Sequence, residues 1–188
     1  DDLRHGTLQA RYQGREQPSL DRVRVDRRVY AGKRYLPVGL VETGRGCPFP
    51  CEFCAIQSFF DRSYRTRPTG AVLAELDELA DRKLVFFVDD NFAGRLAERS
   101  ELLEALARRR QRWITQMSIH AAHDEAFLAS LARAGCAGVL IGFESLDPEN
   151  LRLMGKRFNT MRGGYRVALE NLRRHRIAVY GTFVFGYE

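Results

Sequence analysis

Residues 38–54 of the chain read VGLVETGRGCPFPCEFC, a short apolar run followed by a loop with three cysteines. A continuous apolar run of this kind fits a strand that is buried on both faces of a parallel sheet. The loop begins at the C-terminal end of that strand, where parallel α/β folds usually place their chemistry. Its glycines and prolines favour sharp bends. We therefore expect a buried strand over 38–41 that leads directly into a functional loop.

The rest of the chain alternates between apolar runs and helical patterns. Four more runs predict strands, at 84–88, 113–119, 137–143 and 177–185. Between them, apolar residues at helical spacing predict helices within 69–82 and 96–110, around 127–131 and over 160–176. Such alternation favours right-handed βαβ units around a parallel sheet. The expected fold class is α/β, a partial barrel of parallel strands with outer helices, truncated after the fifth strand.

Composition limits the kinds of protein that this chain can be. With 188 residues, 45% hydrophobic and 29% charged, it is neither a disordered chain nor a disulfide-packed miniprotein. No apolar run approaches the ~20 residues of a membrane span, and the N-terminus lacks the order of a secretion signal. We therefore expect a cytoplasmic protein without a membrane span.

The charge is unevenly distributed. The net charge is +6, and residues 1–37 hold nine Arg or Lys against five Asp or Glu. We interpret residues 1–36 as an N-terminal linker or arm and residues 37–188 as the core domain. Because most of the basic excess lies in the arm and the body is nearly neutral, we do not expect a nucleic-acid partner.

The cysteines are clustered in a way that suggests metal chemistry. Cys47, Cys51 and Cys54 lie within eight residues, and Cys136 stands apart as an expected small buried hydrophobe. In a reducing compartment, clustered thiols more often bind metals than form disulfides. Three thiolates would leave one iron of a four-iron cluster open. Zinc, which prefers four ligands or a histidine, and unliganded thiols remain the alternatives.

The pattern Cys47-x3-Cys51-x2-Cys54, with aromatic Phe53 before the last cysteine, resembles the signature of the radical S-adenosylmethionine (SAM) superfamily. The resemblance covers residues ~37–188. It implies a barrel of the radical SAM type and a [4Fe-4S] cluster on the three cysteines. It also implies SAM on the fourth iron and reductive cleavage of SAM to a 5′-deoxyadenosyl radical. Phe53 is a cofactor-binding candidate.

The same resemblance suggests further contacts to SAM where strands end. Asp89, Asp90 and Asn91 occupy the place of a Gly-Gly-Glu motif that holds the amino group of SAM, in a variant seen in cobalamin-associated members. A helix cap before Leu96 is the alternative.

Two later strands complete this set of candidates. Glu144 and Ser145 correspond to contacts with the ribose or amino-acid part of SAM, although Ser145 is equally suited to cap a turn. Gly181 and Gly186 belong to the strand that lies beside the adenine, with tight packing as the alternative.

The arm indicates which branch of the superfamily is involved. Pro18-x2-Asp21, Arg27-Arg28 and Glu42-Thr43 resemble the connector before the radical domain in cobalamin-binding members. We therefore expect part of a cobalamin-dependent methyltransferase or a related enzyme that modifies small molecules or lipids. Cobalamin would be carried by an upstream domain that this chain lacks, so the chain alone can be inactive. A tRNA-modifying radical SAM methylthiotransferase is the alternative, and a non-enzymatic metal-binding module a distant third.

Two smaller expectations concern partners and histidines. The reaction requires a small-molecule substrate and an external electron donor such as flavodoxin or ferredoxin. His120 and His123 form an H-x-x-H pair, which we expect to be split between a strand end and a helix start rather than to bind a second metal.

Overall fold

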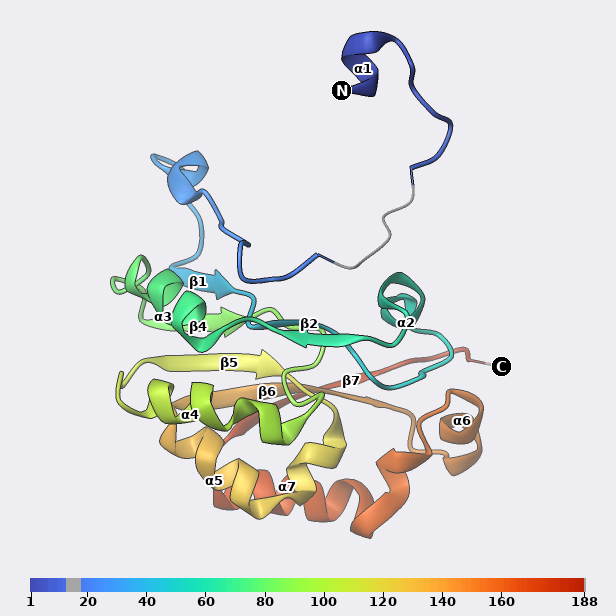
Figure 1. The fold of residues 1–188 in the computed structure, drawn as a ribbon. Coiled ribbons are helices and arrows are strands. Elements are labelled where there is room, and N and C mark those ends of the chain that lie inside the picture. The colour runs from blue at the N-terminus through green and yellow to red at the C-terminus, as the bar shows by residue number, and fades with distance from the viewer. Residues whose placement is uncertain (13–17, 188) are drawn as a thin grey trace.

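The computed structural model of the chain describes residues 1–12 and 18–187, and its centre is a parallel sheet (Figure 1). The strand order is β1-β4-β5-β6-β7, and every neighbouring pair is parallel. The bounds are β1 (Val38–Val41), β4 (Leu84–Phe87), β5 (Arg112–Gln116), β6 (Cys136–Glu144) and β7 (Ala178–Phe183). Each of the five apolar runs is therefore a strand, and the expected α/β class with a parallel sheet is confirmed.

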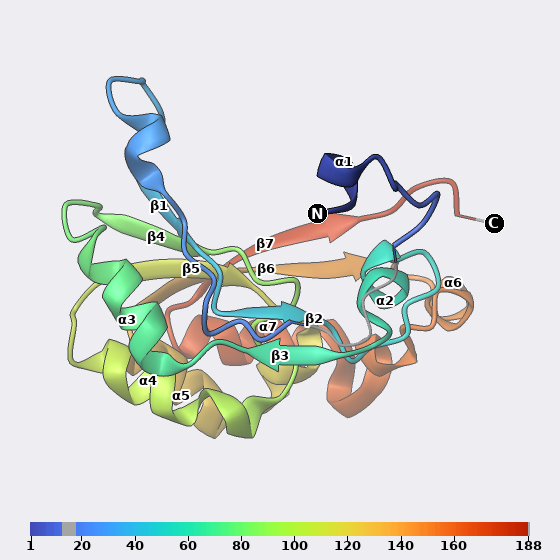
Figure 2. The ribbon, with the colours of Figure 1, turned by 45° about the horizontal axis from the view of Figure 1, so that its top comes forward.

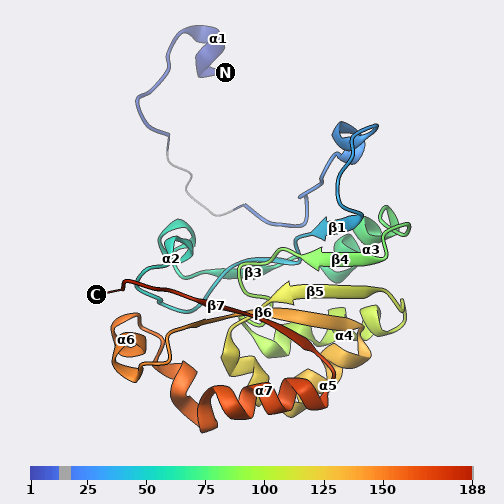
Figure 3. The same cartoon turned by 180° about the vertical axis from the view of Figure 1, so that it is seen from behind.

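Four longer helices lie on one side of the sheet, as Figure 2 shows. They are α3 (Thr69–Asp77), α4 (Ser100–Ala107), α5 (Glu125–Arg133) and α7 (Gly164–Arg174). The core between these helices and the sheet includes Trp113, at 1% exposure, and Cys136, at 6%, as the sequence predicted for both. Seen from behind, α5 and α7 run below the sheet (Figure 3). The helices thus form one outer layer, as expected.

The expectation that the strands are buried on both faces is wrong. Leu40 in β1 is 56% exposed, Tyr180 in β7 is 68% exposed and Phe183 is 45% exposed. The four helices cover only one face, so alternate side chains of the strands point away from the core. An apolar run predicts an apolar strand, but it does not predict whether helices cover one face of the sheet or both.

The helix bounds differ from the sequence prediction where glycines intervene. The segment before α7 is a 3-10 turn, η4 (Arg157–Gly163), rather than the start of the long helix. Gly163 and Gly164 have φ values of +87° and +60°, which lie outside the α-helical region, so the helix begins only at Gly164. The helix predicted over 69–82 ends earlier, at Asp77.

A second, two-stranded sheet was not predicted. β2 (Gly44–Gly46) pairs antiparallel with β3 (Tyr64–Thr66), and α2 (Ala55–Phe60) lies between them in the chain (Figure 2). The cysteine loop therefore follows β2 rather than β1 directly. Gly46 has φ +87°, and a Cβ there would lie 2.1 Å from the Ser63 carbonyl oxygen, so only glycine fits.

The N-terminal arm is partly attached to the body. It contains α1 (Asp2–His5) and a 3-10 turn, η1 (Arg27–Tyr30). Leu20 is 3% exposed, and Arg27 donates to the Leu40 carbonyl oxygen at 2.7 Å and pairs with Glu75. Within the described residues, no helix combines the length and apolar character that crossing a membrane requires.

Candidate functional site

The site expected from the sequence lies at one end of the parallel sheet. β5 and β6 point toward the end where α2 and α6 (Pro148–Leu153) lie (Figure 1). The cysteine loop, residues 47–54, joins β2 to α2 at this end. Because the strands are parallel, the segments that follow β4 and β6 reach the same end. The topology therefore brings the cysteine loop, the segment after β4 and the segment after β6 to the same end of the sheet.

The cysteine loop is hydrogen-bonded to the turn that follows α6. The Glu52 N–H donates to the Met154 carbonyl oxygen at 3.1 Å, and the Cys54 N–H donates to the Cys51 carbonyl oxygen at 3.1 Å. A Cβ at Gly155 would lie 2.8 Å from the Pro50 carbonyl oxygen, so glycine allows this close approach. The loop is therefore held in place by a segment that lies about 100 residues later in the sequence.

The three thiols share one partly buried environment. All three are free cysteines, with Cys51 buried and Cys47 and Cys54 partly buried. The pKa of Cys51 is raised to about 11, mainly by burial. The nearby Lys156 ammonium lowers this pKa, and the other two thiols raise it. A metal that binds the thiolates would replace the thiol protons, and its positive charge would balance the negative charge of the buried sulfur atoms.

The donor set suits a multi-iron cluster. Among residues 1–12 and 18–187, no three His, Cys, Asp or Glu side chains converge as ligands of a single metal ion. A [4Fe-4S] cube binds each cysteine through a different iron, so its three thiolates surround a volume rather than meet at a point. Cys54 acts on the pKa of Cys47, and both of these cysteines act on the pKa of Cys51, so the three thiols lie near one another, as ligands of one cube must.

Asp89 and Asp90 hold the segment that precedes the cysteines. Asp89 is fully buried and accepts hydrogen bonds from the Thr43 N–H at 2.6 Å and the Thr43 hydroxyl at 2.5 Å. It also forms an ion pair with Arg99 at 2.8 Å. The Asp90 carboxylate accepts from the Gly46 N–H at 2.7 Å, one residue before Cys47. Both carboxylates therefore fix β2, and the alternative of a helix cap is not seen, because the turn at Leu96 has no side-chain cap.

Arg99 belongs to this arrangement and was missed by sequence reasoning. It is 1% exposed, and its Nε donates to the Phe92 carbonyl oxygen at 2.6 Å. Its Nη1 donates to the Thr43 hydroxyl at 3.0 Å, and a further donor contacts the Tyr64 hydroxyl. An arginine before an amphipathic helix gives no sequence signal of burial, because most such residues are exposed.

Glu144 ends β6 and forms a buried ion pair with Lys156, which sequence reasoning also missed. The Lys156 Nζ lies 2.6 Å from the Glu144 carboxylate, and each residue is 8% exposed. The same Nζ donates to the Gly142 carbonyl oxygen at 3.2 Å and lies 5.8 Å from the centre of the Phe53 ring. The pair thus links the strand end to the cysteine loop. Nothing in the sequence indicated this pair, because lysine is almost never buried unless it is paired.

Of the other four candidates, Ser145 and Gly181 have local partners that also explain them. The Ser145 hydroxyl accepts from the Asp147 N–H at 3.1 Å, as a turn cap would. A Cβ at Gly181 would lie 2.5 Å from the Phe143 ring, which fits tight packing. Gly186 has φ +74° with open space around it. The Phe53 ring is 43% exposed. Their contacts with a cofactor stay predictions.

The histidine pair differs from its prediction. His120 and His123 both lie in one 3-10 turn, η3 (Ile119–His123), and not in separate elements. The His120 ring packs against Phe49 of the cysteine loop, with centroids 4.9 Å apart. Burial lowers the pKa of His120, so its imidazole is favoured in the neutral form. It acts as a packing partner of the loop.

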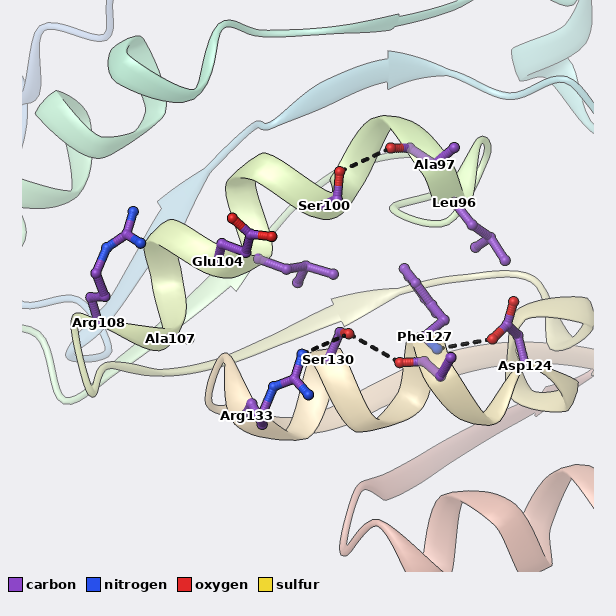
Figure 4. A pocket seen from close by; sticks show the side chains of 12 residues that line it. Leu96, Ala97, Ser100, Glu104, Ala107, Arg108, Asp124, Phe127, Ser130 and Arg133 are labelled. Atoms are coloured by element: carbon purple, nitrogen blue, oxygen red, sulfur yellow. Dashed lines mark hydrogen bonds between the residues drawn. The ribbon is translucent and has the colours of Figure 1, made fainter.

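A further hollow of the surface lies elsewhere. A groove of about 670 Å³ runs between α4 and α5, on the outer side of the helical layer (Figure 4). Residues such as Ser100, Glu104, Phe127 and Arg133 line it, and none of the predicted site residues does. The groove is therefore separate from the cysteine loop.

Comparison with known proteins finds similarity to one protein family and to several methyltransferases. The model of the Radical SAM superfamily matches residues 41–187. The chain is 34% identical over 161 residues to bacteriochlorophyllide d C-12(1)-methyltransferase of Chlorobaculum tepidum, covering 83% of this chain and 35% of the relative. It is 31% identical over 137 residues to hopanoid C-2 methylase of Rhodopseudomonas palustris, covering 68% and 26%. The chain thus spans about a third or less of the length of these relatives.

The fold is similar to that of a solved methyltransferase. TsrM of Kitasatospora setae, a radical S-adenosylmethionine methyltransferase with cobalamin and a [4Fe-4S] cluster bound, matches with a TM-score of 0.71 at 23% identity. The match covers 92% of this chain and 35% of TsrM. A second TsrM structure, with tryptophan and a SAM analogue bound, matches with a TM-score of 0.69, covering 80% and 31%. At this identity the likeness concerns the fold.

Proposed function

Because this chain belongs to the radical SAM superfamily, we propose that Cys47, Cys51 and Cys54 hold a [4Fe-4S] cluster whose fourth iron is left for SAM. When bound and reduced, the cluster supplies the electron that cleaves SAM into methionine and a 5′-deoxyadenosyl radical. The observation that carries the proposal is the cysteine loop itself. It lies at the C-terminal end of the parallel sheet. Asp90 accepts a hydrogen bond from Gly46 directly before the loop, Asn91 donates to Cys47, and the Met154 carbonyl oxygen accepts from the Glu52 N–H.

The proposal gives the Glu144–Lys156 pair a role in SAM binding. The amino-acid part of SAM carries an ammonium and a carboxylate, which are the charges that Glu144 and Lys156 complement. Both side chains are nearly buried beside the cysteine loop, where a charge needs a partner. Binding of SAM would replace the Glu144–Lys156 ion pair by two ion pairs, one between Glu144 and the ammonium of SAM and one between Lys156 and the carboxylate of SAM.

The remaining candidates are assigned by their present contacts. Asp89 has both carboxylate oxygens engaged, so we assign it to holding β2 rather than to touching SAM. Asp90 stays a candidate for the amino group. The aromatic ring of Phe53 and the polar or small residues Ser145, Gly181 and Gly186 are proposed to border the bound SAM.

The whole protein is proposed to be a cobalamin-dependent methyltransferase. Its relatives act on a bacteriochlorophyllide and on hopanoids, and the TsrM structure contains cobalamin. A small-molecule or lipid substrate therefore fits better than tRNA, which only the basic arm favours. Cobalamin would be bound outside this chain, and an external flavodoxin or ferredoxin in a reducing, cytoplasmic setting would supply the electron.

The test is anaerobic reconstitution with iron and sulfide, followed by iron and sulfide analysis and spectroscopy with and without SAM. We expect about four irons per chain and a spectrum that changes when SAM is added. Release of 5′-deoxyadenosine after chemical reduction would extend the result to cleavage.

Two cysteine variants make the test specific. Cys51→Ala is expected to lose the cluster, because only two ligands remain. Cys136→Ala is expected to retain it, because Cys136 lies in the core as a buried thiol. Equal loss in both variants would contradict the site assignment, and failure of the unaltered chain to assemble a cluster would contradict the function.

A further inference from the structure

Asn91 lies between the end of β4 and the cysteine loop, and its amide has only one possible orientation. The side chain is 2% exposed. Its Oδ1 accepts hydrogen bonds from two backbone groups, the Ser118 N–H at 3.1 Å and the Ala93 N–H at 3.3 Å. Because backbone N–H groups can only donate, the amide oxygen must face them, and the amide nitrogen must face the opposite direction.

The amide nitrogen points at a cluster ligand. Asn91 Nδ2 donates to the Cys47 sulfur at 3.5 Å and to the Ser118 hydroxyl at 3.0 Å. The side chain is therefore arranged to stabilise negative charge on this one sulfur.

The same contacts leave Asn91 no group for the ammonium of SAM. A carboxamide offers two N–H donors and two lone pairs, and all four are used by Cys47, Ser118 and Ala93. An ammonium group could bind the amide oxygen only if a backbone hydrogen bond in a buried site were given up. The role predicted from the sequence is thus disfavoured for this residue.

We propose that Asn91 is a positioning residue that raises the reduction potential of the cluster through its hydrogen bond to Cys47. Reduction adds one electron to the cluster and increases negative charge on its thiolate sulfurs. A fixed N–H donor at a sulfur stabilises the reduced form more than the oxidised form. The inference rests on the proposed function, because it needs the cluster to be present.

The experiment is a redox titration of the reconstituted 188-residue chain with dithionite and mediators, followed by electron paramagnetic resonance, first without SAM and then with SAM added. Asn91→Leu removes the donor at similar size. We expect its midpoint potential to become more negative, so that the ratio of reduced to oxidised cluster at a fixed potential falls roughly threefold to tenfold. The midpoint reports only on molecules that carry a cluster, so it is independent of cluster content.

A second variant addresses folding. Asn91→Asp keeps an oxygen that can accept from both backbone N–H groups, but it has no N–H to donate to the Cys47 sulfur. Its negative charge also lowers the midpoint potential, as the loss of the donor does. We expect an even more negative midpoint. Asn171→Leu is the matched control, because Asn171 is also buried, at 3%, and its amide donates to the Ala122 carbonyl oxygen at 3.0 Å. Its midpoint is expected to equal that of the unaltered chain.

The outcomes separate this inference from the proposed function. An unchanged midpoint in both Asn91 variants would overturn the inference and leave the proposed function intact. A shift that appears only with SAM would also overturn it, in favour of a ligand role. Loss of the cluster from both Asn91 variants but not from Asn171→Leu would show a role in assembly rather than tuning. Absence of a cluster in the unaltered chain would contradict the proposed function itself.

Discussion

Arg99 is one of the largest fully buried side chains of the described residues, and its charge is balanced by the carboxylate of Asp89. Its guanidinium lies 4.5 Å from the Phe92 ring centre. It donates hydrogen bonds to the Phe92 carbonyl oxygen and to the Thr43 hydroxyl, on two separate segments that both precede it in the sequence. Removing charges from water is expensive, so such a pair is stable only when it is complete. The residue therefore fixes β2, and with it the start of the cysteine loop.

We expect Arg99→Met to destabilise the protein by about 3–5 kcal/mol, because it leaves the Asp89 carboxylate buried without its partner. The free energy of unfolding from urea denaturation measures this. Arg109→Met is the control, since Arg109 pairs with the exposed Asp77 at 2.5 Å, and surface pairs contribute only about 0–1 kcal/mol. A similar small loss in both variants would contradict the structural role of Arg99.

The pairing of β6 with β7 shows how one element constrains another. Gly181 lies opposite Ile141 in this register, and the Phe143 ring occupies the space where a side chain would begin. The glycine predicted for an approach of adenine therefore has a packing reason of its own. If Gly181 is needed for packing against Phe143, its substitution lowers the free energy of unfolding. If it is needed only for adenine, the free energy of unfolding is unchanged.

We expect Gly181→Ala to cost about 1–3 kcal/mol, because the new methyl group would lie 2.5 Å from a Phe143 ring carbon. Urea denaturation measures the loss. In contrast, Gly70→Ala in α3 meets nothing within 4 Å and is expected to add roughly 0.5–1 kcal/mol of stability. Unchanged stability in Gly181→Ala would favour a role in ligand binding alone.

At the scale of the whole molecule, the cysteine loop connects three distant parts of the chain. Asp90 and Asn91 contact it from the end of β4, Met154 contacts it from the turn after α6, and β3 pairs with the strand before it. A cluster bound at the loop would bind the folded chain but not the unfolded one. Such binding adds to stability by mass action.

We expect removal of the cluster by a chelator under oxidising conditions to lower the free energy of unfolding by roughly 3 kcal/mol or more, the effect of binding at about a hundred times the dissociation constant. Comparison of reconstituted and cluster-free protein in anaerobic urea denaturation measures this difference. Cys136→Ala should show the same difference, and Cys54→Ala should show none. A difference that persists in Cys54→Ala would contradict cluster binding by this cysteine.

Much of the fold was determined by local sequence. The five apolar runs predicted the five parallel strands, and Trp113 and Cys136 were predicted to be buried, because these properties depend on short stretches of chain. The spacing of the three cysteines likewise predicted the superfamily. Helix bounds were less accurate, since Gly163 and Gly164 delay the start of α7.

Only the tertiary structure decided which polar groups meet and which face of the sheet stays open. Arg99 meets Asp89 across ten residues, Lys156 meets Glu144 across twelve, and Asn91 meets Cys47 across 44. The pairing of β2 with β3 and the exposure of Tyr180 are of the same kind. Periodicity and motif spacing describe neighbours along the chain. Partners brought together by a sheet and its crossovers depend instead on the path of the backbone in three dimensions, which no single stretch of sequence contains.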